Sequence, residues 1–275
     1  MSLLERILAR KREEVAAGRL HPPGAPPRKQ GGGNVSTTAT AGRAAARDLQ
    51  RPRGAPLRLI TEVKFKSPSA GPLSRKLGTG ERAVAYALGG ASMVSVLCDE
   101  TYFGGGYGEL AIARTALDSR GLTVPLLAKE FVIDPVQLEW AALDGADAAL
   151  LIARIVDRET LGSLIHAARA LGLEPFVEVM TEAERDAALD AGARIIGVNA
   201  RDLDTLAMDV ERTARVLAGM PPGVVAVHLS GLRSTADVRA VAKGRADAAL
   251  VGEALMRLDD PAPLLRDFVS AAEEA

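Results

Sequence analysis

Short apolar runs alternate with longer amphipathic stretches along most of this chain. A continuous apolar run of this kind is typical of a strand that is buried on both faces, as in a parallel sheet. The sequence therefore predicts eight parallel strands, at residues 57–64, 92–97, 124–129, 146–152, 173–179, 194–199, 224–230 and 246–252.

The stretches between these runs have helical periodicity. Examples are ERAVAYALGGA, DRETLGSLIHAARALG and STADVRAVAKGRA, each with a glycine near its end, which is a common helix stop signal. Eight strands that alternate with helices predict an α/β fold of the (β/α)₈ TIM barrel type. The alternative is an open doubly wound sheet, but neither of the usual nucleotide-binding glycine motifs follows a strand, and GGGYG at 104–108 has a different spacing.

The first 56 residues have a different composition. Apolar positions in residues 1–20 recur at helical spacing, and charges of both signs interrupt them, so this segment does not resemble a signal peptide. Residues 21–46 are rich in Pro, Gly, Ser and Thr and cannot bury enough surface to offset their ordering entropy. We predict an N-terminal helical extension with a flexible Gly/Pro-rich flap over 1–56, and a barrel domain over 57–275.

Charge and cysteine content limit the possible partners and compartment. The 34 basic and 35 acidic residues nearly cancel, so we expect neither a nucleic acid nor a membrane partner. Cys98 is the single cysteine, which excludes an intramolecular disulfide and favours a cytoplasmic location, and its apolar neighbours predict a buried, inert thiol. His228 has no second ligand at metal-binding spacing, so no metal site is expected.

Polar residues mark the C-terminal ends of several predicted strands. In a TIM barrel these ends form the active site. Glu62 and Lys64 end the first run, Lys129 the third, Glu178 the fifth and Asn199 the sixth. Each alone could be a solvated rim residue or part of a structural ion pair. Together on one rim these residues predict a catalytic site, because Lys and Glu are rarely buried without partners.

Glycines follow the last two predicted strands. Ser230-Gly231 and Gly252-Glu253 occupy the positions of the usual TIM-barrel phosphate site, and the short amphipathic run ALMRL follows the second pair. These glycines could simply terminate the strands. Their backbone N–H groups could equally bind a phosphate, with Lys64 as a nearby countercharge, and we therefore expect a small phosphorylated substrate.

Six segments, in this order, resemble the motifs of the indole-3-glycerol phosphate synthase family, which closes the indole ring in tryptophan biosynthesis. The resemblance extends from about residue 57 to 258 and includes the preceding helix. It implies a TIM barrel and a decarboxylating carbon–carbon lyase. The segments are EVKFKSPSAG, VSVLCDETYFGG, PLLAKEFVIDPVQ, FVEVMTEAE, IIGVNARDLDTLAMD and ADAALVGEALMR.

The resemblance also implies a substrate and catalytic roles. The family substrate is 1-(2-carboxyphenylamino)-1-deoxyribulose 5-phosphate, which loses carbon dioxide and then water. Lys129 would be the general acid of ring closure and Glu178 the general base of dehydration, with Lys64 assisting as an acid and contacting the substrate carboxylate. Glu62 and Asn199 would orient Lys64 and the substrate hydroxyls. The family needs no cofactor.

Binding residues follow from the same resemblance. Arg201 and Ser67 would support the substrate at the rim. For the assembly of the protein, we expect a monomer or a weak homodimer. An apolar pocket for the anthranilate ring would be lined by Phe131, Leu150, Ile152, Leu203 and Leu206. The phosphate would be held, largely by main-chain N–H groups, at Ser230, Gly231, Gly252 and Glu253.

The chain departs from the family pattern in two places. Leu229 stands in VHLSGL where the family usually has the glutamate of ESG, and residues 21–46 replace a helical lid. Two other functions therefore stay open. One is a different phosphosugar isomerase or a lyase that forms a Schiff base on Lys129, and the other is a non-catalytic paralog.

Overall fold

The computed structural model describes residues 1–18 and 45–274. In this part of the chain, parallel strands close into a barrel in the order β1-β10-β9-β8-β7-β6-β5-β4, and β1 pairs with both β10 and β4. The TIM-barrel prediction is confirmed and the open sheet is excluded. The strands are β1 (Arg58–Val63), β4 (Met93–Leu97), β5 (Leu126–Lys129), β6 (Ala148–Ile152), β7 (Glu174–Val179), β8 (Ile195–Asn199), β9 (Val225–Leu229) and β10 (Ala248–Val251).

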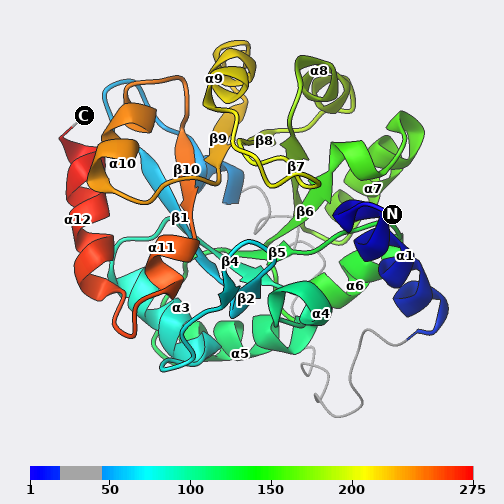
Figure 1. Cartoon of the computed structure of the whole chain (residues 1–275), viewed down its shortest axis with the longest axis horizontal. Coiled ribbons are helices and arrows are strands. Elements are labelled where there is room, and N and C mark those ends of the chain that lie inside the picture. The colour runs from blue at the N-terminus through cyan, green and yellow to red at the C-terminus, as the bar shows by residue number, and fades with distance from the viewer. Residues whose placement is uncertain (19–44, 275) are drawn as a thin grey trace.

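Helices surround the barrel on its outer face (Figure 1). Several begin where the sequence supplies a capping side chain; for example, Asp157 accepts a hydrogen bond from the backbone N–H of Thr160. The covering helices are α3 (Thr79–Leu88), α5 (Tyr107–Asp118), α6 (Pro135–Leu143), α7 (Arg158–Ala170), α8 (Glu182–Asp190), α9 (Val210–Ala218), α10 (Thr235–Ala242) and α12 (Ala262–Glu273).

Short elements occupy the loops between these strands and helices. The loop after β1 forms a small antiparallel hairpin, β2 (Lys66–Ser67) with β3 (Gly71–Pro72). Helix α4 (Glu100–Phe103) follows β4, and the 3-10 helix η1 (Ala153–Ile155) follows β6. The predicted extra helix after the last strand is α11 (Glu253–Met256).

Side chains alternate between the two faces of each strand and build two apolar cores. Leu59, Val94 and Val177 point outward into the core shared with the surrounding helices. Ile60, Leu150 and Phe176 belong to a second buried cluster, which fills the barrel interior. Because the interior is packed with side chains, space for a ligand is left at the C-terminal ends of the strands.

The N-terminal segment contributes to the interior cluster at both ends of the barrel. Helix α1 (Leu3–Ala16) starts with a capping box between Ser2 and Glu5, and it buries Leu4 and Ile7. Helical residues 45–49 also join this cluster. The predicted flap, apart from its last two residues, lies outside the described residues, and the proposed domain boundary stays a prediction.

Two smaller expectations can be compared with the structure. Cys98 is a buried free thiol, and burial raises its pKa well above the ordinary value, as expected for an inert cysteine. Within residues 1–18 and 45–274, no helix combines the length and apolar character needed to cross a membrane.

Candidate active site

One pocket lies at the C-terminal ends of the barrel strands, with an empty volume of about 1160 Å³ that includes solvent at its mouth. Every site residue predicted from the sequence lines this pocket, although the residues come from seven strand ends and their loops. They are Glu62, Lys64, Ser67, Lys129, Phe131, Leu150, Ile152, Glu178, Asn199, Arg201, Leu203, Leu206, Ser230, Gly231, Gly252 and Glu253.

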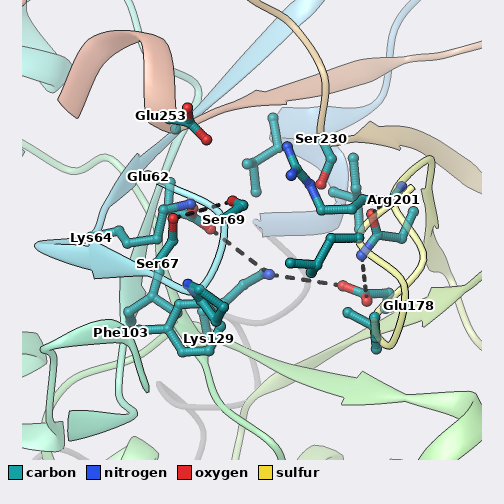
Figure 2. Close-up of a pocket in the computed structure, with 18 of the residues that line it drawn as sticks. Glu62, Lys64, Ser67, Ser69, Phe103, Lys129, Glu178, Arg201, Ser230 and Glu253 are labelled. Carbon is teal, nitrogen blue, oxygen red and sulfur yellow. Dashed lines mark hydrogen bonds and ion pairs between the residues drawn. The ribbon is translucent and has the colours of Figure 1, made fainter. Parts of the chain in front are cut away.

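Two lysines meet at the buried carboxylate of Glu62, as Figure 2 shows. Lys64 Nζ donates a hydrogen bond of 2.5 Å to Glu62 Oε1, and Lys129 Nζ lies 3.8 Å from Glu62 Oε2. Strand alternation explains the first contact, because residues 62 and 64 point to the same face. The Lys129 contact depends on strand order, because β4 pairs with β1 on one side and with β5 on the other.

The charge state of Glu62 reflects this pair of cations. Burial alone would raise its pKa, but Lys64 and Lys129 outweigh that effect and lower the pKa below the ordinary value of 4.5. The carboxylate is therefore ionised at neutral pH and can hold both ammonium groups in place.

This lowered pKa predicts a pH-dependent contribution to stability. Glu62→Gln should lower the free energy of unfolding by about 1.5–3 kcal/mol at pH 7, the usual range for a hydrogen bond to a charged group. Because the folded pKa is depressed, the difference between native protein and variant should be constant above pH 4.5 and shrink as the pH falls further. Urea denaturation at a series of pH values measures this difference. A difference that grows on acidification would contradict the lowered pKa.

A second polar pair faces the first across the pocket. Lys129 Nζ lies 3.8 Å from Glu178 Oε2, and Asn199 Nδ2 donates a hydrogen bond of 2.9 Å to Glu178 Oε1. The Asn199 amide thus orients Glu178. The predicted role of Asn199 in orienting Lys64 and the substrate hydroxyls stays a prediction. Its own oxygen accepts the backbone N–H of Arg201 at 3.0 Å.

This hydrogen bond leaves one carboxylate oxygen of Glu178 available. Oε2 is buried and has no hydrogen-bond partner among the described residues, apart from the ion-pair contact with Lys129. An unpartnered carboxylate oxygen beside an ammonium group can accept a proton from a bound molecule. Figure 2 shows Lys129 between the two carboxylates of Glu62 and Glu178.

One wall of the pocket is apolar. Phe131 and Phe103 pack with their ring centroids 6.0 Å apart, and the predicted leucine and isoleucine side chains continue this wall. Helix α1 adds Leu3, Leu4 and Ile7, which the sequence analysis did not place in the site. Their helical spacing was visible in the sequence, but not the surface against which the helix packs.

Backbone conformation is unusual at the opposite wall. Ser230 and Gly231 have positive φ angles of 70° and 96°, and a non-glycine residue in this region is uncommon. Glu253 accepts hydrogen bonds from Arg257, one turn along α11, so its contribution to anion binding would come from its backbone N–H group. Arg233 also lines this wall and was not predicted.

Gly252 allows the two halves of the site to approach each other. A Cβ atom at this position would lie 2.7 Å from Glu62 Oε1, so a larger residue would displace the carboxylate. This close approach connects the glycine loop after β10 with the Glu62 and Lys64 pair on the neighbouring strand.

Leu229, the residue that departs from the family pattern, is buried in the interior cluster and lines the pocket. It pairs in register with Asn199. Its side chain covers Gly197, where an added Cβ would lie 2.6 Å from Leu229 Cδ1. The site therefore has an apolar surface beside the Glu178 and Asn199 pair where a carboxylate was expected.

Solved structures with similar architecture show the fold alone, because their sequence identity is low. Thiamine phosphate pyrophosphorylase from Pyrococcus furiosus aligns with a TM-score of 0.59 and 17% identity, over 79% of this chain and 96% of that chain. The 3-hexulose-6-phosphate synthase from Salmonella typhimurium aligns with a TM-score of 0.58 and 17% identity, over 79% of this chain and 99% of that chain.

Relatives found by sequence have much higher identity to this chain than these solved structures. The indole-3-glycerol phosphate synthase of Mycolicibacterium vanbaalenii is 42% identical over 219 residues, which cover 80% of this chain and 79% of the relative. The indole-3-glycerol phosphate synthase of Mycobacteroides abscessus is 44% identical over 213 residues, which cover 78% of this chain and 76% of the relative. The family model described as indole-3-glycerol phosphate synthase matches residues 4–268. The chain therefore belongs to the indole-3-glycerol phosphate synthase family.

Proposed function

We propose that this chain converts 1-(2-carboxyphenylamino)-1-deoxyribulose 5-phosphate to indole-3-glycerol phosphate, carbon dioxide and water. The observation that carries the proposal is the meeting of Lys64 and Lys129 with Glu62 and Glu178 in one pocket. Membership of the family supports the same reaction.

The two walls of the pocket suggest how the substrate would bind. The anthranilate ring would pack on the apolar wall around Phe131, and the phosphate would lie against the backbone N–H groups near Gly231 and Gly252. In this orientation the carbonyl carbon would lie between the two ends of the pocket, near Lys129. Arg201 and Ser67, which also line the pocket, would contact the substrate at the rim.

Ring closure needs a proton on the carbonyl oxygen. In our proposal the Lys129 ammonium donates that proton while the ring carbon that bears the carboxylate attacks the carbonyl carbon. The new carbon–carbon bond forms, the carbonyl oxygen becomes a hydroxyl, and carbon dioxide leaves from the attacking carbon. Glu62 and Glu178, each 3.8 Å from Lys129 Nζ, would hold the ammonium in position.

Dehydration needs a base and an acid on the same intermediate. Glu178 would take the proton that is lost, because its Oε2 atom has no hydrogen-bond partner in the described protein. Lys64, held by Glu62, would protonate the leaving hydroxyl, which departs as water. Asn199 keeps the Glu178 carboxylate oriented toward the pocket.

A steady-state assay with the purified chain tests this function. Indole formation from the substrate should produce an increase in fluorescence, and no product at high enzyme concentration would refute the proposal. Borohydride treatment in the presence of a ketose phosphate provides the test against the Schiff-base alternative. Our proposal predicts no covalent adduct, whereas trapping on Lys129 would support the other lyase.

Leu229 gives a prediction about the rate. Leu229→Glu should raise kcat on the order of 10-fold, if the restored carboxylate contributes about 1.4 kcal/mol to transition-state stabilisation by orienting the ammonium groups. Leu229→Gln is the matched control, because it adds a polar side chain without charge. A kcat for Leu229→Glu no higher than that of Leu229→Gln would mean that the site works without this carboxylate.

The remaining features of the proposal concern the state of the protein in the cell. We propose that its substrate is a small phosphorylated molecule, that it acts as a monomer or weak homodimer, and that it resides in the cytoplasm. Family membership supports a phosphorylated substrate, and the single buried cysteine supports the cytoplasmic assignment.

A further inference from the structure

Lys11 of helix α1 is a lysine whose side chain is only 1% exposed, although it lies outside the set of residues that line the pocket. Its Nζ atom lies 2.8 Å from Asp99 Oδ2, 3.0 Å from Glu130 Oε2 and 3.0 Å from Glu14 Oε2. Asp99 and Glu130 are also buried. A buried ammonium group is costly unless it is paired, so this cluster fixes α1 on the barrel.

Each of the two barrel carboxylates uses its other oxygen to hold a loop. Asp99 Oδ1 accepts the backbone N–H of Tyr102 at 2.6 Å and caps α4, which ends at Phe103. Glu130 Oε1 accepts the backbone N–H of Phe131 at 2.7 Å. The same two side chains therefore contact Lys11 on one side and the backbone of pocket-lining loops on the other.

The loops held in this way carry the apolar wall and a catalytic candidate. Phe103 and Phe131 pack against each other at 6.0 Å, and Lys129 directly precedes Glu130. Lys11 thus connects the loop after β4 with the loop after β5. Neither loop could shift alone without separating Lys11 from one of its carboxylates.

A second contact fixes the start of α1 to another loop of the site. The backbone N–H of Leu4 donates a hydrogen bond of 3.2 Å to Asp204 Oδ1, in the loop after β8. Between this contact and Lys11, the side chains of Leu4 and Ile7 line the pocket. Helix α1 is therefore anchored at two points, and the Lys11 anchor is the buried one.

We propose that Lys11 is a positioning residue for ring closure, whose buried ammonium fixes Lys129 and the Phe103–Phe131 wall relative to each other. The catalytic part of this inference rests on the proposed function. Without the ammonium, Asp99 and Glu130 would lose the partner that they share. Burial already raises the pKa of Glu130 to about 7, so Glu130 would take up a proton, and no ion pair would then hold the two loops together. A displacement of about 1 Å at a catalytic group can cost on the order of 100-fold in rate.

The test compares Lys11→Met with Lys11→Arg, which keeps the charge. Arg10→Met is the matched control, because Arg10 belongs to the same helix but is exposed and pairs only with Glu13 and Glu14 among the described residues. Hydrogen–deuterium exchange in residues 99–104 and 130–132 should rise at least 10-fold in Lys11→Met, remain native in Arg10→Met and recover partly in Lys11→Arg. This readout does not depend on catalysis.

Kinetics provide the second readout. Lys11→Met should lower kcat/KM about 100-fold, with both a higher KM and a lower kcat, and Lys11→Arg should recover part of the loss. If Lys11→Met does not fold, adding Glu130→Gln removes one unpaired charge, and this double variant should fold but keep the exchange and kinetic defects. Native exchange in both loops together with native kcat/KM would overturn the proposal. A wild-type protein that lacks turnover would refute the proposed function, while the exchange data would still test the role of Lys11 in loop order.

Discussion

Replacing Lys129 by methionine is expected to lower kcat for indole formation by about 10²- to 10⁴-fold, the range usually lost with a general acid. Lys129 is the ammonium group that lies between Glu62 and Glu178, 3.8 Å from each carboxylate. Methionine keeps most of the side-chain length but cannot donate a proton. The fold should survive, because Lys64 still pairs with Glu62 and Asn199 still donates to Glu178.

The matched control is Lys243→Met, at the C-terminal cap of α10, because Lys243 is exposed and is not among the residues that line the pocket. Its kcat should equal that of the native protein, and both variants should unfold at similar temperatures. A Lys129→Met protein that retains more than a tenth of the native kcat would show that another group protonates the carbonyl oxygen.

Replacing Glu178 by glutamine should separate the two halves of the reaction. The amide oxygen of glutamine can still accept the hydrogen bond from Asn199 Nδ2, so the geometry is preserved while the base is lost. Indole formation should fall by about 10²- to 10⁴-fold. Carbon dioxide release should be affected much less, because in our proposal it follows ring closure by Lys129 and precedes dehydration.

Parallel measurement of carbon dioxide and indole-3-glycerol phosphate in a rapid-mixing experiment checks this separation. Glu139→Gln, an exposed position on α6, is the control and should release both products at native rates. Equal slowing of the two products in Glu178→Gln would instead mean that Glu178 acts before or during decarboxylation.

The barrel and its reactive rim could be predicted because each depends on local sequence. Each strand is a short apolar run, and the polar residue at its end marks the edge where the run leaves the core. Lys129 is an example: it ends the run of β5, and barrel closure brings every such end to the same rim. The predicted boundaries differ from the observed strands by only one or two residues.

Contacts that join distant segments could not be predicted in this way. Lys11 and Glu130 are 119 residues apart, and nothing in the amphipathic pattern of α1 indicates which barrel loops it contacts. The hydrogen bond from Asn199 to Glu178 was also not predicted, because the side chains that meet across β7 and β8 depend on strand register. Leu229 was recognised as unusual, but only the structure shows that it packs over Gly197.

The central claim is that this one pocket performs both ring closure and dehydration. The most direct test is a single-turnover experiment with excess enzyme and 1-(2-carboxyphenylamino)-1-deoxyribulose 5-phosphate labelled in its carboxylate carbon. We predict one equivalent of labelled carbon dioxide and one equivalent of indole-3-glycerol phosphate for each substrate consumed. Unchanged substrate, or labelled carbon dioxide without the indole product, would contradict the claim.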